Sequence, residues 1–439
     1  MYMMTEAPIS EKSIICMRRI IHPVGQGAFY TEDFYGQNAY VGLVVYDCGT
    51  TKKAEKERLK EEIKRLPEGK DVDILFISHF DKDHVCGIKD LMQGRKIKRV
   101  VIPQISGFEW FYIVEDACMS KPWVGYRVNR HLFDTISDLA HSDSVGDVVE
   151  VKPINDEGYH PGNIERPNND IPENDRPLES QHTSVKSNHQ KGIMGRTQSS
   201  VVPDSKSSTF SSGDNVYLDS VKVWEYIPFN YTDGKDINNL KDRINNVLRN
   251  ELTNNGYNSI DQVPYQEVCN LIEPHLAEIN KEYKNVFGSS NASSMCVYSG
   301  CLTGTVRDHF GGLLFRSGKK REVFPEAEPI RKEACLYTGD SVLINNDKLK
   351  FLLEHLGDRN KHIGLFQIPH HGSRNNFDLD SLDMMRDYGC MPDYTFICYG
   401  TKNRYKHPSI RLVDMLLKKT RVCSVNENLL RQEILIMKD

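Results

Sequence analysis

The sequence contains no apolar run long enough to cross a membrane, and its first residues lack the apolar core of a secretion signal. A membrane-spanning helix needs about 20 consecutive apolar residues, and a signal peptide carries an apolar stretch behind a basic start. We therefore expect a soluble protein of the cytoplasm that makes no membrane contact.

Paired cysteines are also missing. The 11 cysteines are scattered without a C-x-x-C pair or an even framework of spacings. Small secreted domains depend on such frameworks for their disulfides. The pattern favours reduced thiols, which agrees with a cytoplasmic protein.

The chain has no excess of positive charge. Its 56 Lys and Arg residues stand against 61 Asp and Glu residues, which gives a net charge of −5. A global basic field is therefore excluded, and any contact with nucleic acid must depend on local cationic patches. The 439 residues, 39% hydrophobic and 27% charged, suit a soluble globular protein with one large domain or several average ones.

Strand-like and helix-like stretches alternate in the first hundred residues. Residues 14–24, 40–46, 74–77 and 98–103 are short runs rich in β-branched residues, which predict strands. Between them, residues 52–66 predict a charged surface helix with one apolar face. This alternation predicts an α/β fold built of layered sheets and helices.

Two later stretches interrupt this pattern. Residues 155–213 are dominated by polar residues and proline, so they cannot bury enough apolar surface to offset their ordering entropy, and we expect a disordered insertion. Residues 237–287 read as added helices. The chain is therefore expected to comprise a first half-domain (14–154), the insertion, and a second half-domain (214–439) that contains the helical insertion.

The stretch ILFISHFDKDHVCG, residues 74–87, is the strongest chemical signal in the chain. A buried strand ends in His79, Asp81, Asp83 and His84, four side chains that can all bind a metal ion. A solvated acidic turn is the alternative interpretation, but such turns seldom carry two histidines as well. The pattern indicates a metal site.

Other aspartate and histidine residues, which can also bind a metal ion, follow other predicted strands. Asp47 follows the strand at 40–46, Asp340 follows a short apolar run at 334–337, and His370 and His371 follow the strand at 363–368. In sheets packed against helices, ligands gather beyond the carboxyl ends of the strands. The repetition predicts that these side chains converge.

The loop at 79–84 resembles the H-x-H-x-D-H signature of the metallo-β-lactamase fold, with Asp81 in the position of the second histidine. Further motifs resemble the branch of that fold typified by the hydrolase domain of the DNA-uptake competence protein ComEC. In chain order they are Val24-Gly25-Gln26-Gly27, Asp47-Cys48-Gly49, Asn291-Ala292-Ser293-Ser294, Thr338-Gly339-Asp340, His370-His371-Gly372-Ser373 and Arg404-Tyr405-Lys406-His407-Pro408-Ser409.

This resemblance implies an αββα sandwich, whose two halves flank the insertion, with a metal centre at one edge. It implies one metal on Asp83, His84, Asp340 and one of the two histidines His370 and His371, which the sequence does not separate. His79 and Asp81 would face a second metal, with Asp340 bridging and Asp47 orienting a ligand imidazole.

The sequence departs from the family pattern at two places. Asp81 replaces an imidazole with an oxygen ligand, and no histidine occurs in the third motif, where Asn291 to Ser294 stand. We therefore expect two divalent ions, Zn2+ or Mn2+, of which the second binds more weakly, because oxygen-rich ligation moves the preference from zinc towards manganese.

Paired divalent ions of this kind favour phosphodiester hydrolysis. The sequence predicts a phosphodiesterase or nuclease acting on DNA, in DNA processing or defence against foreign DNA, with Asp83, Asp340 and His407 as catalytic residues. Lys402, Arg404 and Ser373 are expected to contact substrate phosphate, and His407 to protonate the leaving group. Without the resemblance, a solvated turn explains the 402–407 loop equally well.

Two other functions are compatible with the same residues. The metal centre could hydrolyse a small phosphoester, a lactone or a thioester. Alternatively, the chain could be a non-catalytic scaffold, although the retained set of metal ligands argues against that. Activity on bis-p-nitrophenyl phosphate against a lactone panel separates the enzyme classes, and metal content tests the scaffold.

Overall fold

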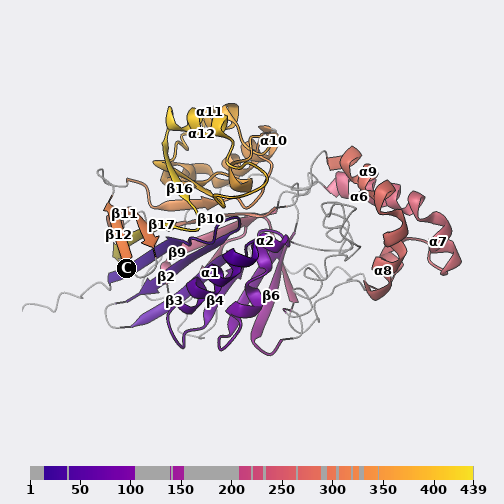
Figure 1. Cartoon of the computed structure of the whole chain (residues 1–439), viewed down its shortest axis with the longest axis horizontal. Helices are drawn as coiled ribbons and strands as arrows, with labels where there is room; N and C mark the ends of the chain where they lie inside the picture. Colours follow the sequence, from indigo (N-terminus) through magenta and orange to yellow (C-terminus); the bar gives the residue numbers. More distant parts are fainter. Residues whose placement is uncertain are drawn as a thin grey trace, which may run out of the picture.

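A computed structural model describes residues 14–36, 39–103, 139, 142–152, 207–218, 221–230, 234–263, 265–287, 294–302, 306–317, 320–325, 331–344 and 346–438. Two mixed β-sheets pack face to face, and helices cover the outer face of each sheet (Figure 1). The four layers confirm the αββα sandwich that the sequence predicts.

The first sheet has ten strands. In spatial order they are β12 (Lys320–Pro325), β11 (Val306–Ser317), β17 (Leu429–Lys438), β1 (Ile14–Ile21), β2 (Phe29–Tyr35), β3 (Tyr40–Cys48), β4 (Val72–Phe76), β5 (Ile97–Pro103), β6 (Val145–Lys152) and β7 (Ser207–Ser211). The strands from β12 to β3 pair antiparallel, and those from β3 to β7 pair parallel.

The second sheet has seven strands. In spatial order they are β16 (Arg421–Val425), β15 (Tyr394–Cys398), β14 (Ile363–Gln367), β13 (Ala334–Tyr337), β10 (Cys296–Cys301), β9 (Val221–Phe229) and β8 (Val216–Leu218). The first four run parallel to one another, and β10 runs antiparallel to β13.

The helices divide among the two sheets and a separate lobe. They are α1 (Lys53–Lys64), α2 (Lys82–Val85) and α3 (Ile88–Leu91) on the first sheet, α10 (Asn346–Leu356), α11 (Leu379–Asp387) and α12 (Ile410–Leu417) on the second, and α6 (Gly234–Val247), α7 (Arg249–Asn254), α8 (Tyr265–Ile272) and α9 (Leu276–Phe287) in the lobe. Among the described residues, no helix is long and apolar enough to cross a membrane.

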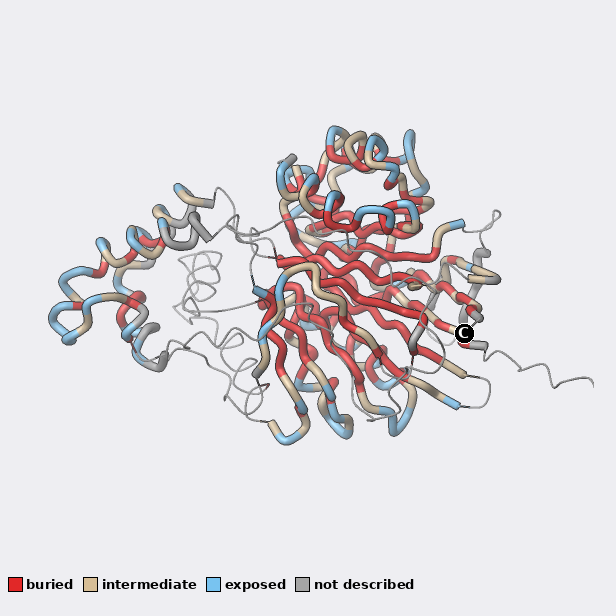
Figure 2. The backbone as a smooth tube through the Cα atoms, turned by 180° about the vertical axis from the view of Figure 1, so that it is seen from behind, coloured by how far each residue is buried: buried red, intermediate tan, exposed pale blue. Residues whose placement is uncertain are grey.

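The central core lies between the two sheets, where side chains such as Phe76, Trp224 and Phe396 are buried. Figure 2 shows the strands at the centre of the two sheets mostly buried, whereas buried and exposed residues alternate along the helices. This difference explains the sequence pattern, because a strand covered on both faces reads as a continuous apolar run. A surface helix instead shows apolar residues at helical spacing, such as Leu59 and Ile63 of α1.

The helical lobe projects from one side of the sandwich (Figure 1). Helix α6 packs against α9, and Arg243 forms an ion pair with Glu282 at 2.7 Å across that contact. The lobe occupies the stretch that the sequence predicts as a helical insertion, 237–287.

The polar stretch 155–213 lies mostly outside the described residues. Its end, however, forms β7, which pairs parallel with β6 at the edge of the first sheet. An edge strand can be built from Ser and Thr because pairing needs only the backbone N–H and C=O groups. Composition alone therefore does not reveal this strand.

His355 in α10 is a buried imidazole whose protonation should affect stability. Its ring packs on Phe351, with ring centroids 3.6 Å apart, and its Nδ1 donates to the Phe351 carbonyl oxygen at 2.9 Å. Burial lowers the pKa of His355 to about 4, from 6.5. The unfolded chain therefore takes up a proton between these pH values and the folded chain does not, so stability falls as pH falls below 6.5.

We expect His355 to contribute about 2 kcal/mol less to the free energy of unfolding at pH 5 than at pH 7. The measurement is urea unfolding of the wild type and His355→Gln at both pH values, with metal content held constant. The difference in stability between the two proteins should shrink on acidification. Parallel pH profiles would show that His355 titrates normally in the folded protein.

Candidate metal centre

Five loops of the sandwich meet at one edge. Asp47 is the last residue but one of β3, His79 follows β4, and Asp340 follows β13. His370 and His371 follow β14, and the loop at 400–409 follows β15. Because β3 and β4 are parallel, as are β13, β14 and β15, their carboxyl ends point the same way. The topology therefore gathers the side chains that the sequence places at separate strand ends.

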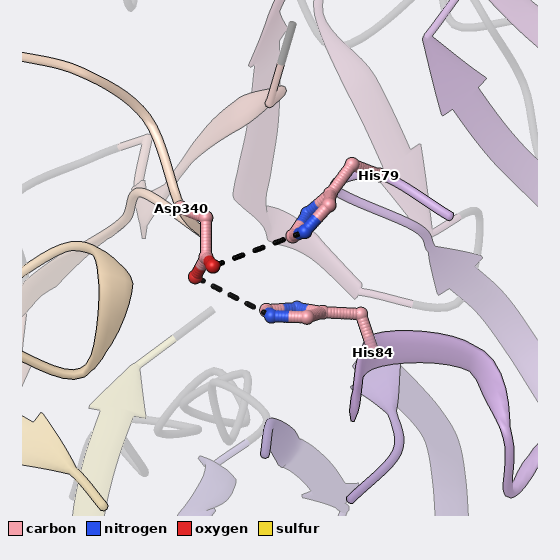
Figure 3. Close-up of side chains that lie close together, drawn as sticks. All are labelled: His79, His84 and Asp340. Carbon is pink, nitrogen blue, oxygen red and sulfur yellow. Dashed lines mark ion pairs between the residues drawn. The ribbon is translucent and has the colours of Figure 1, made fainter. Parts of the chain in front are cut away.

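Asp340 lies between two histidines of the β4 loop (Figure 3). One carboxylate oxygen, Oδ1, is 3.3 Å from His84 Nε2, and the other, Oδ2, is 4.0 Å from His79 Nε2. All three residues are buried. The Nε2 atoms of both histidines and Oδ1 of Asp340 have no hydrogen-bond partner among the described residues.

Unpartnered polar atoms are costly when buried. Two nitrogen lone pairs and one anionic oxygen aimed at a common point are the donors that a divalent transition-metal ion prefers. The residues His79, His84 and Asp340 therefore fit a bound metal ion, and they form one of two groups of suitable spacing in the described residues.

The second group consists of Asp83, His84 and His371. His371 Nε2 lies 3.2 Å from Asp83 Oδ2, and His371 Nδ1 donates to the Cys398 carbonyl oxygen at 2.8 Å. With its proton held on Nδ1, His371 presents the Nε2 lone pair to the site. The geometry thus assigns His371, rather than His370, to the group with Asp83.

His370 and Asp81 lie on the other side of Asp340. His370 Nε2 is 3.7 Å from Asp340 Oδ2, and Asp81 Oδ2 is 3.6 Å from His79 Nε2. Their side chains are partly exposed, at 26% for His370 and 28% for Asp81. This side of the centre is therefore more open to solvent than the side built on His84.

Asp47 orients both histidines of the β4 loop. Its Oδ2 accepts from His84 Nδ1 at 2.8 Å and from the Ser78 hydroxyl at 2.7 Å. The Ser78 oxygen, whose proton is directed at Asp47, can accept from His79 Nδ1 at 3.0 Å. Both imidazoles thereby keep their proton on Nδ1 and leave Nε2 free for a metal ion.

The electrostatics of the cluster favour positive charge. Burial opposes the charged form of His84, but the carboxylates of Asp340 and Asp47 outweigh it and raise the pKa of His84 well above its usual range. Burial likewise opposes ionisation of Asp340, yet the nearby histidines, His370 and His84 foremost, hold the pKa of Asp340 well below its usual range. A divalent ion would replace the protons on these histidines and supply the same positive charge.

Glycines let the loops approach one another closely. A Cβ on Gly49 would lie 2.4 Å from the carbonyl carbon of Asp83, and a Cβ on Gly339 would lie 2.3 Å from Ser294 Oγ. Gly339 also has a positive φ of 52°. These contacts explain why glycine follows Asp47-Cys48 and precedes Asp340 in the sequence motifs.

Ser294 is a site residue whose role the sequence does not reveal. Its Oγ accepts from the Asp340 backbone N–H at 3.0 Å and lies 3.4 Å from His79 Nδ1. The sequence shows only that this motif has no histidine, and its other members, Asn291 to Ser293, lie outside the described residues. Because β10 is antiparallel to β13, its amino end reaches the edge where the other strands end.

Gln367 is a second residue that sequence reasoning misses. It ends β14, and its side-chain oxygen accepts from the backbone N–H groups of Thr338 at 2.9 Å and Gly339 at 3.2 Å. It therefore holds the turn that carries Asp340. No local motif signals this role, because the contact joins strands that are far apart in the sequence.

The residues that the sequence predicts to contact substrate differ in how far they are exposed. Lys402 and Arg404 are exposed on the loop after β15. Ser373 is buried, and its hydroxyl accepts from the Asn375 N–H at 3.2 Å within its own turn, so its contact with substrate stays a prediction. His407 lies beside His370, with ring centroids 5.4 Å apart.

His407 has an environment that disfavours a second proton. Burial, together with the charges of His370 and His371, lowers the pKa of His407 to about 4. The imidazole is therefore neutral at pH 7. A neutral imidazole can hydrogen-bond to a substrate, and the role of His407 as proton donor to the leaving group stays a prediction.

One family model matches part of the chain. A family model described as the metallo-beta-lactamase superfamily matches residues 33–167, which include Asp47 and the whole 79–84 loop. This match confirms a domain of that superfamily in this part of the chain. No curated protein matches the sequence.

Among solved structures, the chain is similar to one described as the crystal structure of a long form RNase Z from yeast. The identity is 9% and the TM-score 0.29, with 97% of this chain and 42% of that chain covered. The chain thus spans less than half the length of that protein.

Proposed function

We propose that this metallo-β-lactamase superfamily domain is a metal-dependent phosphodiesterase that acts on nucleic acid, with DNA as the expected substrate. The observation that carries the proposal is the buried group of His79, His84 and Asp340, whose facing polar atoms lack other partners in the described part of the chain. The ordered set of ComEC-like motifs supports DNA rather than a small molecule as substrate, in DNA processing or defence.

Asp83, His84 and His371 would hold one divalent ion, and His79, Asp81 and Asp340 a second. Bound ions of this type supply Lewis acidity, which activates water for attack and stabilises the leaving oxygen. The set of His79, Asp81 and Asp340 contains only one imidazole, so it should bind its ion more weakly and favour Mn2+ over Zn2+.

The chain's own residues orient the reaction. Asp47 keeps the proton of His84 on Nδ1, and Asp340 presents one oxygen to each histidine of the β4 loop. Lys402 and Arg404 would hold nonbridging phosphate oxygens through charge-assisted hydrogen bonds. His407, neutral at pH 7, would donate a hydrogen bond to the substrate.

A screen of metals against substrates tests this function. We expect hydrolysis of bis-p-nitrophenyl phosphate and of DNA with Mn2+ or Zn2+, and loss of both activities in Asp83→Ala, because that variant removes one ligand of the His84 group. Asp358→Ala, at a carboxylate whose side chain is 82% exposed, is the matched control and should keep full activity.

The same screen decides between the proposed function and its rivals. Turnover of lactones or thioesters without phosphodiester hydrolysis would place the metal centre in another hydrolase class. A protein that binds no metal, by elemental analysis after incubation with each ion, would be the non-catalytic scaffold.

The two outer cations should affect DNA binding without affecting metal content. Lys402→Ala and Arg404→Ala each remove one phosphate contact, so affinity for DNA should fall about 3- to 10-fold. The slope of log affinity against log salt should become shallower by about 0.7 to 0.9 per variant. Lys361→Ala, at a lysine whose side chain is 69% exposed, is the control and should leave the slope unchanged. Equal salt slopes in all four proteins would remove Lys402 and Arg404 from the binding surface.

A further inference from the structure

The loop after β15 has a fixed shape with an exposed tip. The Asn403 side chain closes its base, because Oδ1 accepts from the His407 N–H at 3.0 Å and Nδ2 donates to the carbonyl oxygens of His407 at 2.5 Å and Gly400 at 2.7 Å. Residues 404–406 therefore project as a tip, and all three are exposed. A loop held in this way loses little entropy on binding.

The tip presents an aromatic ring among cations. Tyr405 is 49% exposed, which is unusual for a large aromatic residue among those the structure describes. Its ring stacks on His407, with centroids 6.1 Å apart and an interplanar angle of 15°. The Arg404 guanidinium lies 5.0 Å from the ring centroid and donates to the Tyr405 hydroxyl at 2.9 Å, which fixes the orientation of the ring.

The Tyr405 ring is connected to the metal centre through two histidines. His407 lies between Tyr405 and His370 in a series of ring contacts, and His370 Nε2 is 3.7 Å from Asp340 Oδ2. A nucleic acid whose phosphate lies at the metal centre would therefore have this exposed ring on the same side of the site, beyond His370 and His407. Lys402, Arg404 and Lys406 are exposed cations of the same loop.

We propose that Tyr405 is a stacking platform for an unpaired base near the phosphate that is cleaved, so that the substrate is single-stranded nucleic acid or a single-stranded end. This inference rests on the proposed function and adds the strandedness of the substrate. In a duplex, neighbouring bases cover both faces of each base, so only an unpaired base can stack on an exposed side chain. Stacking of this kind tolerates every base, so the enzyme would show little sequence preference.

Binding measured under conditions that prevent cleavage tests the platform. The full chain, in EDTA, is titrated into fluorescein-labelled oligothymidylate, a duplex of equal length, and an oligonucleotide of abasic residues of equal length. We expect the wild type to bind oligothymidylate at least about fivefold more tightly than the abasic strand. Tyr405→Ala should lose about 5- to 150-fold in affinity for oligothymidylate, and the advantage of bases over abasic residues should disappear.

Three variants separate stacking from other effects of the substitution. Tyr405→Phe keeps the ring and should retain most of the affinity, whereas Tyr405→Leu keeps an apolar surface without a flat ring and should behave like Tyr405→Ala. Phe310→Ala removes another exposed aromatic, 59% exposed on β11 and remote from the β4 loop in sheet order, and should bind like the wild type.

The inference is overturned if Tyr405→Ala binds oligothymidylate like the wild type or loses equal affinity for the abasic strand. It is also overturned if Tyr405→Leu retains full binding, because an apolar contact without ring stacking would then suffice. The proposed function fails in a different way, namely if oligothymidylate binds through Tyr405 but is not cleaved when Mn2+ or Zn2+ replaces EDTA. Cleavage of DNA with no effect of Tyr405→Ala would keep the function and refute the platform.

Discussion

Asp340→Ala should abolish turnover and strip metal from the protein. Asp340 presents Oδ1 to His84 and Oδ2 to His79 and His370, so one substitution removes an anionic ligand from both sides of the centre. We expect activity on bis-p-nitrophenyl phosphate to fall by roughly 1,000-fold or more, because the groups that stabilise charge in the transition state are lost together. Elemental analysis should show reduced metal content in the same preparation.

Two controls separate ligand loss from misfolding. Asp340→Asn keeps the side-chain volume and the backbone N–H that donates to Ser294, so it should fold like the wild type and still lose activity. Asp358→Ala should retain both activity and metal. If Asp340→Ala keeps its metal and full turnover, the centre described above is wrong.

Glu32→Ala should cost about 3–5 kcal/mol of stability, because it removes one of the two buried carboxylates that pair with Arg19, the other being Glu433 at 2.8 Å. Glu32 on β2 is 2% exposed and accepts from Arg19 Nε at 2.8 Å. It also accepts from three side chains of the second sheet: the hydroxyls of Tyr226 at 2.6 Å, Ser299 at 2.8 Å and Tyr337 at 3.0 Å. One carboxylate thus joins the two sheets through their shared core.

Urea unfolding at fixed metal content measures this effect, since bound metal stabilises the folded state independently. A double-mutant cycle with Arg19→Met tests the mechanism. If the cost comes from an uncompensated charge, Arg19→Met should restore part of the stability lost in Glu32→Ala. Additive losses would show that the two residues act separately.

The glutamate also illustrates a limit of sequence interpretation. The segment Phe29–Tyr35 forms β2, yet Thr31, Glu32 and Asp33 interrupt its apolar pattern, so the sequence does not predict this strand. In the structure these residues are buried with partners, and Asp33 accepts from Arg18 at 2.9 Å. Neighbouring strands supply those partners, and a pattern along one segment contains no information about its neighbours.

The metal loop is the part that the sequence determines. His79, Asp81, Asp83 and His84 lie within six residues after a buried strand, so the local backbone brings them together whatever the rest of the chain does. The positions of Asp47, Asp340 and the pair His370 and His371 at strand ends follow from the same reasoning, because the carboxyl ends of parallel strands share an edge.

Tertiary structure decides which of these residues act together. The pairing of β14 with β15 directs His371 Nδ1 to the Cys398 carbonyl oxygen. This contact places His371, rather than His370, in the group with Asp83. The antiparallel direction of β10 brings Ser294 to the Asp340 turn, and Asn403 fixes the loop that exposes Tyr405. Short-range periodicity fixes where strands end, but contacts between segments far apart in the chain depend on sheet order and direction, which a single sequence leaves open.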